Sequence, residues 1–239
     1  MVNVNQPLNL LKFQPVIQDT IIGVVLAGGQ SSRMGQNKAL LSRSSPEPQQ
    51  VLDHSIDESM LYFTCQQLVQ AGVNKVIISG SAAIYTDKVI AGIAFNLAVP
   101  VARVSDEQEA QGPVGGIASV ITAQTVEPVN TGNSETHYLF VPVDLPLLQA
   151  MDLAQLIQAG NLNKRTAHFE KQPLPLYIYS VTHAQKALQQ RAKGDGSVWY
   201  LASLLRSLTI LPPEPDHWLN ANTPQEWAYA LFMINPTAD

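Results

Sequence analysis

A glycine turn followed by spaced cations is the part of this sequence that could do chemistry. Gly28 and Gly29 end an apolar run, and Arg33 and Lys38 follow within the next ten positions. Adjacent glycines let the main chain approach a ligand closely and present N–H groups to it. Two positive side chains in the same loop favour a polyanionic ligand. Residues 28–38 therefore predict a loop that binds phosphate groups.

Two well-known phosphate loops do not fit these residues. A P-loop needs Gly-Lys-Ser/Thr five positions after its first glycine, but Met34 stands five positions after Gly29, and Lys38 is followed by Ala39. The dinucleotide fingerprint G-x-G-x-x-G is absent as well, because the next glycine after the adjacent pair is Gly35. A P-loop NTPase and a dinucleotide-dependent oxidoreductase are thus disfavoured.

The elements that must position this loop alternate between strands and helices. Residues 21–26 and 75–80 are short apolar runs rich in β-branched side chains, and residues 59–71 between them have helical spacing with Gly72 at their end. A second cycle follows, with a strand expected from Val99 that runs into Ser105 and Asp106, a helix opening at the glycines of 112–116, and a further strand over 138–148. This order predicts an α/β fold with an open, mainly parallel Rossmann-like sheet and helices on both faces.

Two other parts of the chain carry expectations. Residues 39–57 are polar, contain prolines and show no period, so we expect a flexible loop. In the last third, Thr223, Pro224 and Glu226 have the types and spacing of a helix N-cap, first turn and capping box. We expect an N-terminal extension over 1–20 and a single domain over 21–239.

Asp144 is the strongest metal-ligand candidate. It follows an apolar strand in the string VPVDLPLL, where a lone carboxylate is costly unless it is solvated, paired or bound to a metal. Mg²⁺ prefers oxygen ligands and needs only one or two carboxylates when substrate phosphates complete its shell. The alternative is that Asp144 caps the turn before Pro146.

The string LAGGQSSRMGQNK (residues 26–38) resembles the signature LAGG-x-S-x-RMG-x-x-K of nucleotidyltransferases that couple a nucleoside triphosphate to a phosphorylated acceptor. Within that superfamily, it is most similar to the bacterial molybdenum cofactor guanylyltransferases. The resemblance implies a fold of the nucleotide-diphospho-sugar transferase type and transfer of GMP from GTP to molybdopterin, with Mg²⁺ as cofactor. It also implies a cytoplasmic protein, with other cofactor-biosynthesis proteins or target apoenzymes as partners.

The resemblance assigns roles to residues that match the family's motifs. Arg33, Lys38 and Asp144 are implied to be catalytic, with Asp144 as the metal ligand. Gly112, Gly115 and Asn222 are expected to line the active site. The residues implied to bind GTP are Leu26, Ala27, Gly28, Lys38, Ser79, Asp106 and Asp144. The family usually passes from the lysine through a short turn to the next helix, so the resemblance implies that residues 42–57 are an insertion. Another departure concerns the acceptor: the family often carries an arginine before a late helix, where this chain reads GDGSVWYLASLL from Gly194.

Composition narrows the function classes. A net charge of −5 argues against a general nucleic-acid surface or a surface for anionic membranes, and no apolar run is long enough to span a bilayer. Cys65 is the single cysteine, so an internal disulfide is excluded and a reducing compartment fits. Three alternatives remain open: a cytidylyltransferase for the same pterin, a sugar-phosphate nucleotidyltransferase, and a non-catalytic nucleotide-binding protein.

Overall fold

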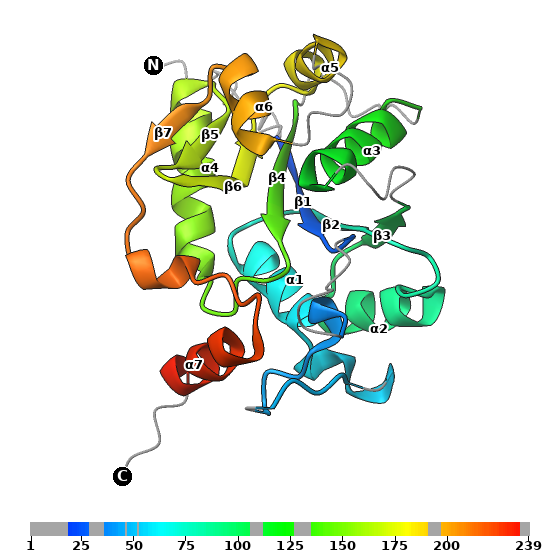
Figure 1. Ribbon diagram of the computed structural model, residues 1–239. Helices are drawn as coiled ribbons and strands as arrows, with labels where there is room; N and C mark the ends of the chain where they lie inside the picture. Colours follow the sequence, from blue (N-terminus) through cyan, green and yellow to red (C-terminus); the bar gives the residue numbers. More distant parts are fainter. Residues whose placement is uncertain are drawn as a thin grey trace, which may run out of the picture.

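The computed structural model describes residues 19–28, 36–45, 47–51, 53–105, 112–126, 135–190 and 197–234. Within this part of the chain lies one seven-stranded sheet in the order β3-β2-β1-β4-β6-β5-β7 (Figure 1). Its strands are β1 (Thr20–Leu26), β2 (Lys75–Ser79), β3 (Val101–Val104), β4 (Thr136–Pro142), β5 (Ala167–Phe169), β6 (Gln172–Ile178) and β7 (Leu208–Ile210).

All strands but β6 run in the same direction, because only the β4–β6 and β5–β6 pairs are antiparallel. The predicted α/β fold with a mainly parallel sheet is therefore confirmed. The parallel register places Leu26 of β1 beside Ser79 of β2 and Pro142 of β4. The carboxyl ends of these strands form one edge, which is where ligands bind in open α/β sheets. In Figure 1 the arrowheads of β1 and β4 point to this edge.

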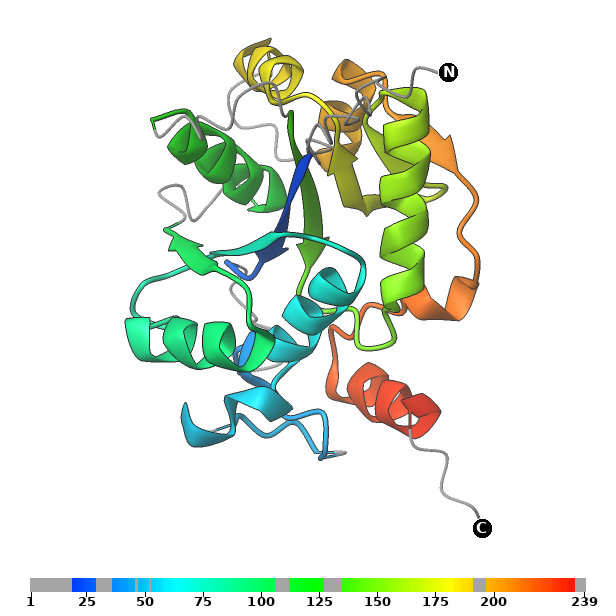
Figure 2. The ribbon, with the colours of Figure 1, turned by 180° about the vertical axis from the view of Figure 1, so that it is seen from behind.

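Helices cover both faces of the sheet, as predicted. The α-helices are α1 (Met60–Gln70), α2 (Asp87–Leu97), α3 (Gly112–Val126), α4 (Ala150–Asn163), α5 (Val181–Gln190), α6 (Val198–Leu204) and α7 (Pro224–Ile234). One buried cluster joins the sheet to α1, α2, α4 and α7, and a second joins it to α3, α5 and α6. Figure 2 shows α4 in front of the sheet, and Figure 1 shows it behind.

The apolar run at 21–26 forms β1 because it is buried on both faces. Val25 packs into the cluster that contains α1, and Val24 packs into the cluster beneath α3. Such two-sided burial is what a central parallel strand requires. Cys65 lies in α1, where it is buried and free.

The expectation of an irregular loop over 39–57 is wrong for much of this stretch. It contains the 3-10 helices η1 (Lys38–Leu40) and η2 (Asp53–Glu58), and isolated bridges pair Leu41 with Gln50 and Ser42 with Ser59. Ala39, Leu41 and Ile56 are buried. Three scattered apolar side chains show no period in the sequence, yet each one enters the core.

One further expectation needs correction, and two helices lie where the sequence analysis predicts no element. The strand predicted over 138–148 ends at Pro142, and the residues after it turn toward α4. Helices α2 and α4 are not predicted by the sequence analysis. Among the described residues, no helix is both long and apolar enough to cross a membrane.

Candidate active site

Lys38 is held at the start of the short helix η1. Asn37 caps this helix, because its Oδ1 accepts a hydrogen bond from the Ala39 N–H at 2.9 Å. Ala39 is fully buried, which anchors the turn to the core. The cap therefore fixes the backbone from which the Lys38 side chain extends toward the carboxyl edge of the sheet.

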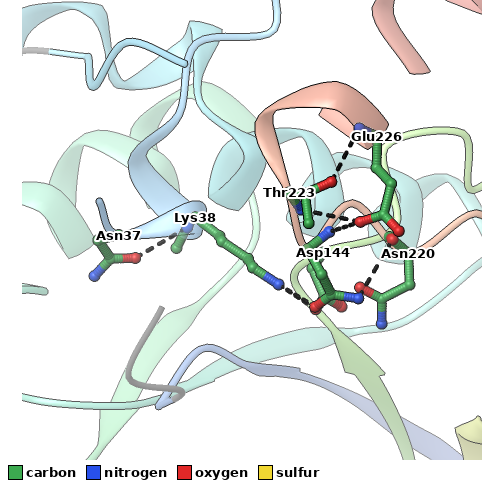
Figure 3. A network of polar contacts seen from close by, with 8 residues as sticks. Asn37, Lys38, Asp144, Asn220, Thr223 and Glu226 are labelled. Carbon is green, nitrogen blue, oxygen red and sulfur yellow. Dashed lines mark hydrogen bonds and ion pairs between the residues drawn. The ribbon is translucent and has the colours of Figure 1, made fainter. Parts of the chain in front are cut away.

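Lys38 contacts both Asp144 and Asn222, and Figure 3 shows its side chain directed toward Asp144. Its Nζ lies 3.1 Å from Asp144 Oδ2 and donates to Asn222 Oδ1 at 2.5 Å. The side chains of Lys38 and Asp144 are only 14% and 18% exposed, so water screens this ion pair less than it would screen one on the open surface. Three residues that the sequence analysis singled out are thus brought together.

Asp144 lies two residues beyond the end of β4, in the turn that leads to α4. Its carbonyl oxygen accepts a hydrogen bond from Ala221 N–H at 3.1 Å. This bond joins the turn after β4 to the segment before α7. Asp144 and Asn222 are consequently held side by side although they are far apart in the sequence.

Asn222 is held by the start of α7. The Glu226 carboxylate accepts from the N–H groups of Asn222 and Thr223 at 2.8 and 2.9 Å, and Thr223 Oγ1 accepts from Glu226 N–H. The capping box predicted at this position is confirmed. Hydrogen bonds lower the pKa of Glu226, and the one from Asn222 N–H has the largest effect.

One oxygen of Asp144 has no hydrogen-bond partner in the described structure. Oδ2 is paired with Lys38, but Oδ1 is buried and has no such partner. An unpaired buried carboxylate oxygen is costly, and a hard cation is a ligand that relieves that cost. No cluster of three or more His, Cys, Asp or Glu side chains occurs in the part of the chain that the structure describes. The arrangement therefore fits a cation that shares one carboxylate with substrate phosphates.

The residues whose main chain is predicted to contact the nucleotide lie at the end of β1. Ala27 N–H donates to Ser79 O at 2.9 Å, and Ala27 O accepts from the Tyr85 hydroxyl at 2.9 Å. Leu26 O accepts from Val143 N–H at 3.3 Å. These bonds hold residues 26 and 27 in place, so that Gly28 begins the loop from a fixed point.

The structure places Ser79, Gly112 and Gly115 at the same edge of the sheet. Ser79 ends β2, and its Oγ is buried without a hydrogen-bond partner in the described structure. Gly112 begins α3 with a φ of +59°, and Gly115 is buried in the first turn of this helix. A 15-residue helix that begins here points the positive end of its dipole toward the site.

Several predicted residues lie outside the described structure. They are Gly29, Arg33, Asp106 and residues 191–196, which include Gly194. Their predicted roles in nucleotide or acceptor binding stay predictions.

Arg43 is a neighbour of the site that the sequence analysis does not identify. Its guanidinium carbon lies 3.5 Å from the centre of the Phe63 ring, and Nη2 donates to Pro146 O at 3.2 Å, two residues after Asp144. Burial lowers the pKa of Arg43 to about 10, so the group remains charged at neutral pH. Two residues further along the chain, the carbonyl oxygen of Ser45 accepts a hydrogen bond from Trp227 Nε1 of α7 at 3.3 Å. Residues 43–45 thus contact both the Asp144 turn and α7.

Comparison with known families gives a match over most of the chain. The family model of the "MobA-like NTP transferase domain" matches residues 23–209. This range includes Lys38 and Asp144 but ends before Asn222.

Named relatives match over similar lengths. A molybdenum cofactor guanylyltransferase from Xanthomonas euvesicatoria is 35% identical over 222 residues, which are 90% of this chain and 95% of the relative. Another protein of that name, from Shewanella piezotolerans, is 27% identical over 87% of this chain and 90% of its own length.

Solved structures support the fold. The crystal structure of 4-diphosphocytidyl-2C-methyl-D-erythritol synthase superposes with a TM-score of 0.61, covering 91% of this chain and all of that chain. Its sequence identity to this chain is 11%, so this likeness concerns the fold alone. The predicted sheet of the nucleotide-diphospho-sugar transferase type agrees with it.

Proposed function

The chain belongs to the MobA-like NTP transferase family of nucleotidyltransferases, and from this we infer that it transfers GMP from GTP to molybdopterin. The observation that carries this assignment to particular residues is the contact of Lys38 Nζ with Asp144 and Asn222, beside a buried Asp144 oxygen without a partner. A triphosphate substrate requires a positively charged side chain, here Lys38, and a carboxylate that can bind a metal, here Asp144, at the carboxyl edge of the sheet.

The reaction is a substitution at phosphorus. A phosphate oxygen of molybdopterin forms a bond to the α-phosphorus of GTP, and the bond from that phosphorus to the oxygen of the β-phosphate breaks. Pyrophosphate leaves with that oxygen, and no electrons are transferred. The attacking phosphate is already an anion, so the protein needs no general base. Its task is to align two negatively charged groups and to stabilise the charge that develops.

Each residue has a separate part in this proposal. Lys38 and Arg33 hold the β- and γ-phosphates, and main-chain groups of Leu26, Ala27 and Gly28 hold the base. Asp144 would hold Mg²⁺, which when bound neutralises phosphate charge and orients the α-phosphate. Asn222 keeps the Lys38 amine beside the Asp144 carboxylate.

Four further residues stay in the proposal with supporting roles. Ser79, Gly112 and Gly115 line the nucleotide side, and Asp106 contacts the nucleotide near the metal. Delivery of molybdopterin by other cofactor-biosynthesis proteins, and of the product to target apoenzymes in the cytoplasm, belongs to the same proposal.

The test measures the four nucleotides separately. Binding of GTP, CTP, ATP and UTP to the purified protein is titrated with Mg²⁺ and without it, and pyrophosphate release is then followed with molybdopterin present. Selective, Mg²⁺-dependent GTP binding with release only after molybdopterin is added is the expected result. A preference for CTP would reassign the chain to a cytidylyltransferase. Binding without release would indicate another acceptor, such as a sugar phosphate, or a non-catalytic role.

A further inference from the structure

The hydroxyl of Tyr85 lies beside both Ala27 and Asn37, the residues that flank the glycine-rich loop (residues 28–36). It donates to Ala27 O at 2.9 Å, and Asn37 Nδ2 lies 3.4 Å away in a position to donate to it. Ala27 precedes residues 28–36 and Asn37 follows them. One side chain, from a distant segment between β2 and α2, therefore joins the entry of the loop to its exit.

The ring of Tyr85 is fixed in this position. Tyr85 is fully buried, and a Cβ added to Gly80 would lie 2.4 Å from its Cε2 atom. The Arg103 guanidinium donates to the carbonyl of Tyr85 and holds its backbone. Burial raises the pKa of the Tyr85 hydroxyl to about 12, so the group keeps its proton at neutral pH and remains a donor.

Asn37 links this contact to Lys38. The Oδ1 atom of Asn37 caps the helix that begins at Lys38, while Nδ2 of the same amide faces the Tyr85 hydroxyl. The orientation that satisfies one contact also satisfies the other. A shift of the Tyr85 hydroxyl would therefore move the cap, and with it the backbone that carries Lys38.

We propose that Tyr85 is a positioning residue for the nucleotide: its hydroxyl sets the separation of Ala27 and Asn37 and so holds Lys38 in place. This inference rests on the proposed function, because it concerns the same nucleotide site. Without the hydroxyl, the carbonyl of Ala27 loses its donor and the side-chain amide of Asn37 loses an acceptor. Binding of the nucleotide must then order both sides of the loop.

Tyr85→Phe tests the hydroxyl with the ring retained. Tyr138→Phe is the matched control, because Tyr138 is another buried tyrosine, stacked on Phe140 beneath the opposite face of the sheet. We expect Tyr85→Phe to weaken GTP binding by up to roughly 5- to 150-fold, the range that follows from leaving a buried acceptor unpaired. We expect the KM for GTP to rise more than kcat falls. The melting temperature should also fall, because the buried carbonyl of Ala27 is left unpaired, so the comparison with Tyr138→Phe rests on KM.

The outcomes separate a positioning role from a structural one. If Tyr85→Phe has a lower melting temperature and a smaller active fraction but a KM for GTP like that of Tyr138→Phe, the hydroxyl only stabilises the fold and the inference is wrong. A wild-type protein that binds another nucleoside triphosphate instead of GTP overturns the base assignment, and the same comparison is then made with that nucleotide. A wild-type protein that binds none overturns both proposals.

A double-mutant cycle with Gly80→Ala gives an independent test. The added methyl group must displace the Tyr85 ring, so this variant should also weaken GTP binding. Once the ring is displaced, the hydroxyl has little left to contribute. We therefore expect Gly80→Ala with Tyr85→Phe to bind GTP no more weakly than Gly80→Ala alone. Fully additive losses would contradict the positioning role.

Discussion

The amine of Lys38 donates to the side-chain oxygen of Asn222, 184 positions further along the chain, at 2.5 Å. The same amine pairs with Asp144, 106 positions away. Three chain segments thus meet at one nitrogen atom. Because the three groups share that atom, a change to any one of them alters the surroundings of the other two.

Replacing Asn222 by alanine should lower activity while the fold is kept. The amide oxygen that accepts from Lys38 is lost, and Lys38 is held mainly by Asp144. We expect pyrophosphate release to fall about 10- to 100-fold, the effect of one misplaced charged donor. Asn163→Ala, at the end of α4, is the control and should keep wild-type activity. Equal rates in the two variants would contradict a role for Asn222.

Asp144→Asn tests the metal site without a change of shape. The amide cannot supply a second anionic oxygen, so the affinity for the cation should fall. We expect a loss of turnover of about 10³-fold or more, with an Mg²⁺ titration that no longer saturates in the wild-type range. Glu170→Gln makes the same change of carboxylate to amide at an exposed position and should leave both values unchanged. Near wild-type turnover in Asp144→Asn would rule out the proposed mechanism.

Glu226→Gln should change how stability depends on pH. Hydrogen bonds, first that from Asn222 N–H, lower the pKa of Glu226 below its ordinary value of 4.5. The unfolded chain therefore binds this proton more readily, so the contribution of Glu226 is complete above about pH 4.5 and is lost as the pH falls through the lower folded pKa. Urea unfolding of the wild-type protein and of Glu226→Gln is measured from pH 6.5 downward. The difference in unfolding free energy between them should shrink as the pH falls below about 4.5. A difference independent of pH would exclude the charged cap.

Arg43→Lys should destabilise the protein more than Arg165→Lys. Both arginines donate to a backbone carbonyl, but only Arg43 also stacks on an aromatic ring and is largely buried. Lysine keeps the charge and loses the planar group, so we expect a loss of about 1–2 kcal/mol in unfolding free energy. Because Nη2 of Arg43 holds the carbonyl of Pro146 beside the Asp144 turn, pyrophosphate release should also decrease. Equal unfolding curves for the two variants would contradict this role.

Much of the architecture follows from local patterns in the sequence. The β-branched run at 21–26 forms a central strand because its side chains suit burial on both faces. The spacing of Thr223 and Glu226 predicts the cap of α7 because both groups act within one helical turn. Lys38 and Asp144 were each predicted for the site from loops that follow strands, and parallel strands bring such loops to one edge.

Other parts of the site depend on contacts that leave no local pattern. Tyr85 is a single aromatic residue in a short turn, and its role is visible only when Ala27 and Asn37 are beside it. Arg43 lies in a stretch without a period, yet it packs on Phe63. The division into an extension over 1–20 and one domain over 21–239 stays a prediction.

The contact between Lys38 and Asn222 also determines when, during synthesis of the chain, the site can form. The strands that carry the glycine-rich loop and Asp144 leave the ribosome well before residue 222 does, and they can pair as soon as they emerge. The amine of Lys38 meets its last partner only when the segment before α7 has docked, so a growing chain can pair β1 with β4 before it can align a nucleotide. Synthesis of this protein therefore separates pairing of the central strands from activity: catalytic competence is acquired only after residue 222 has been synthesised and has docked.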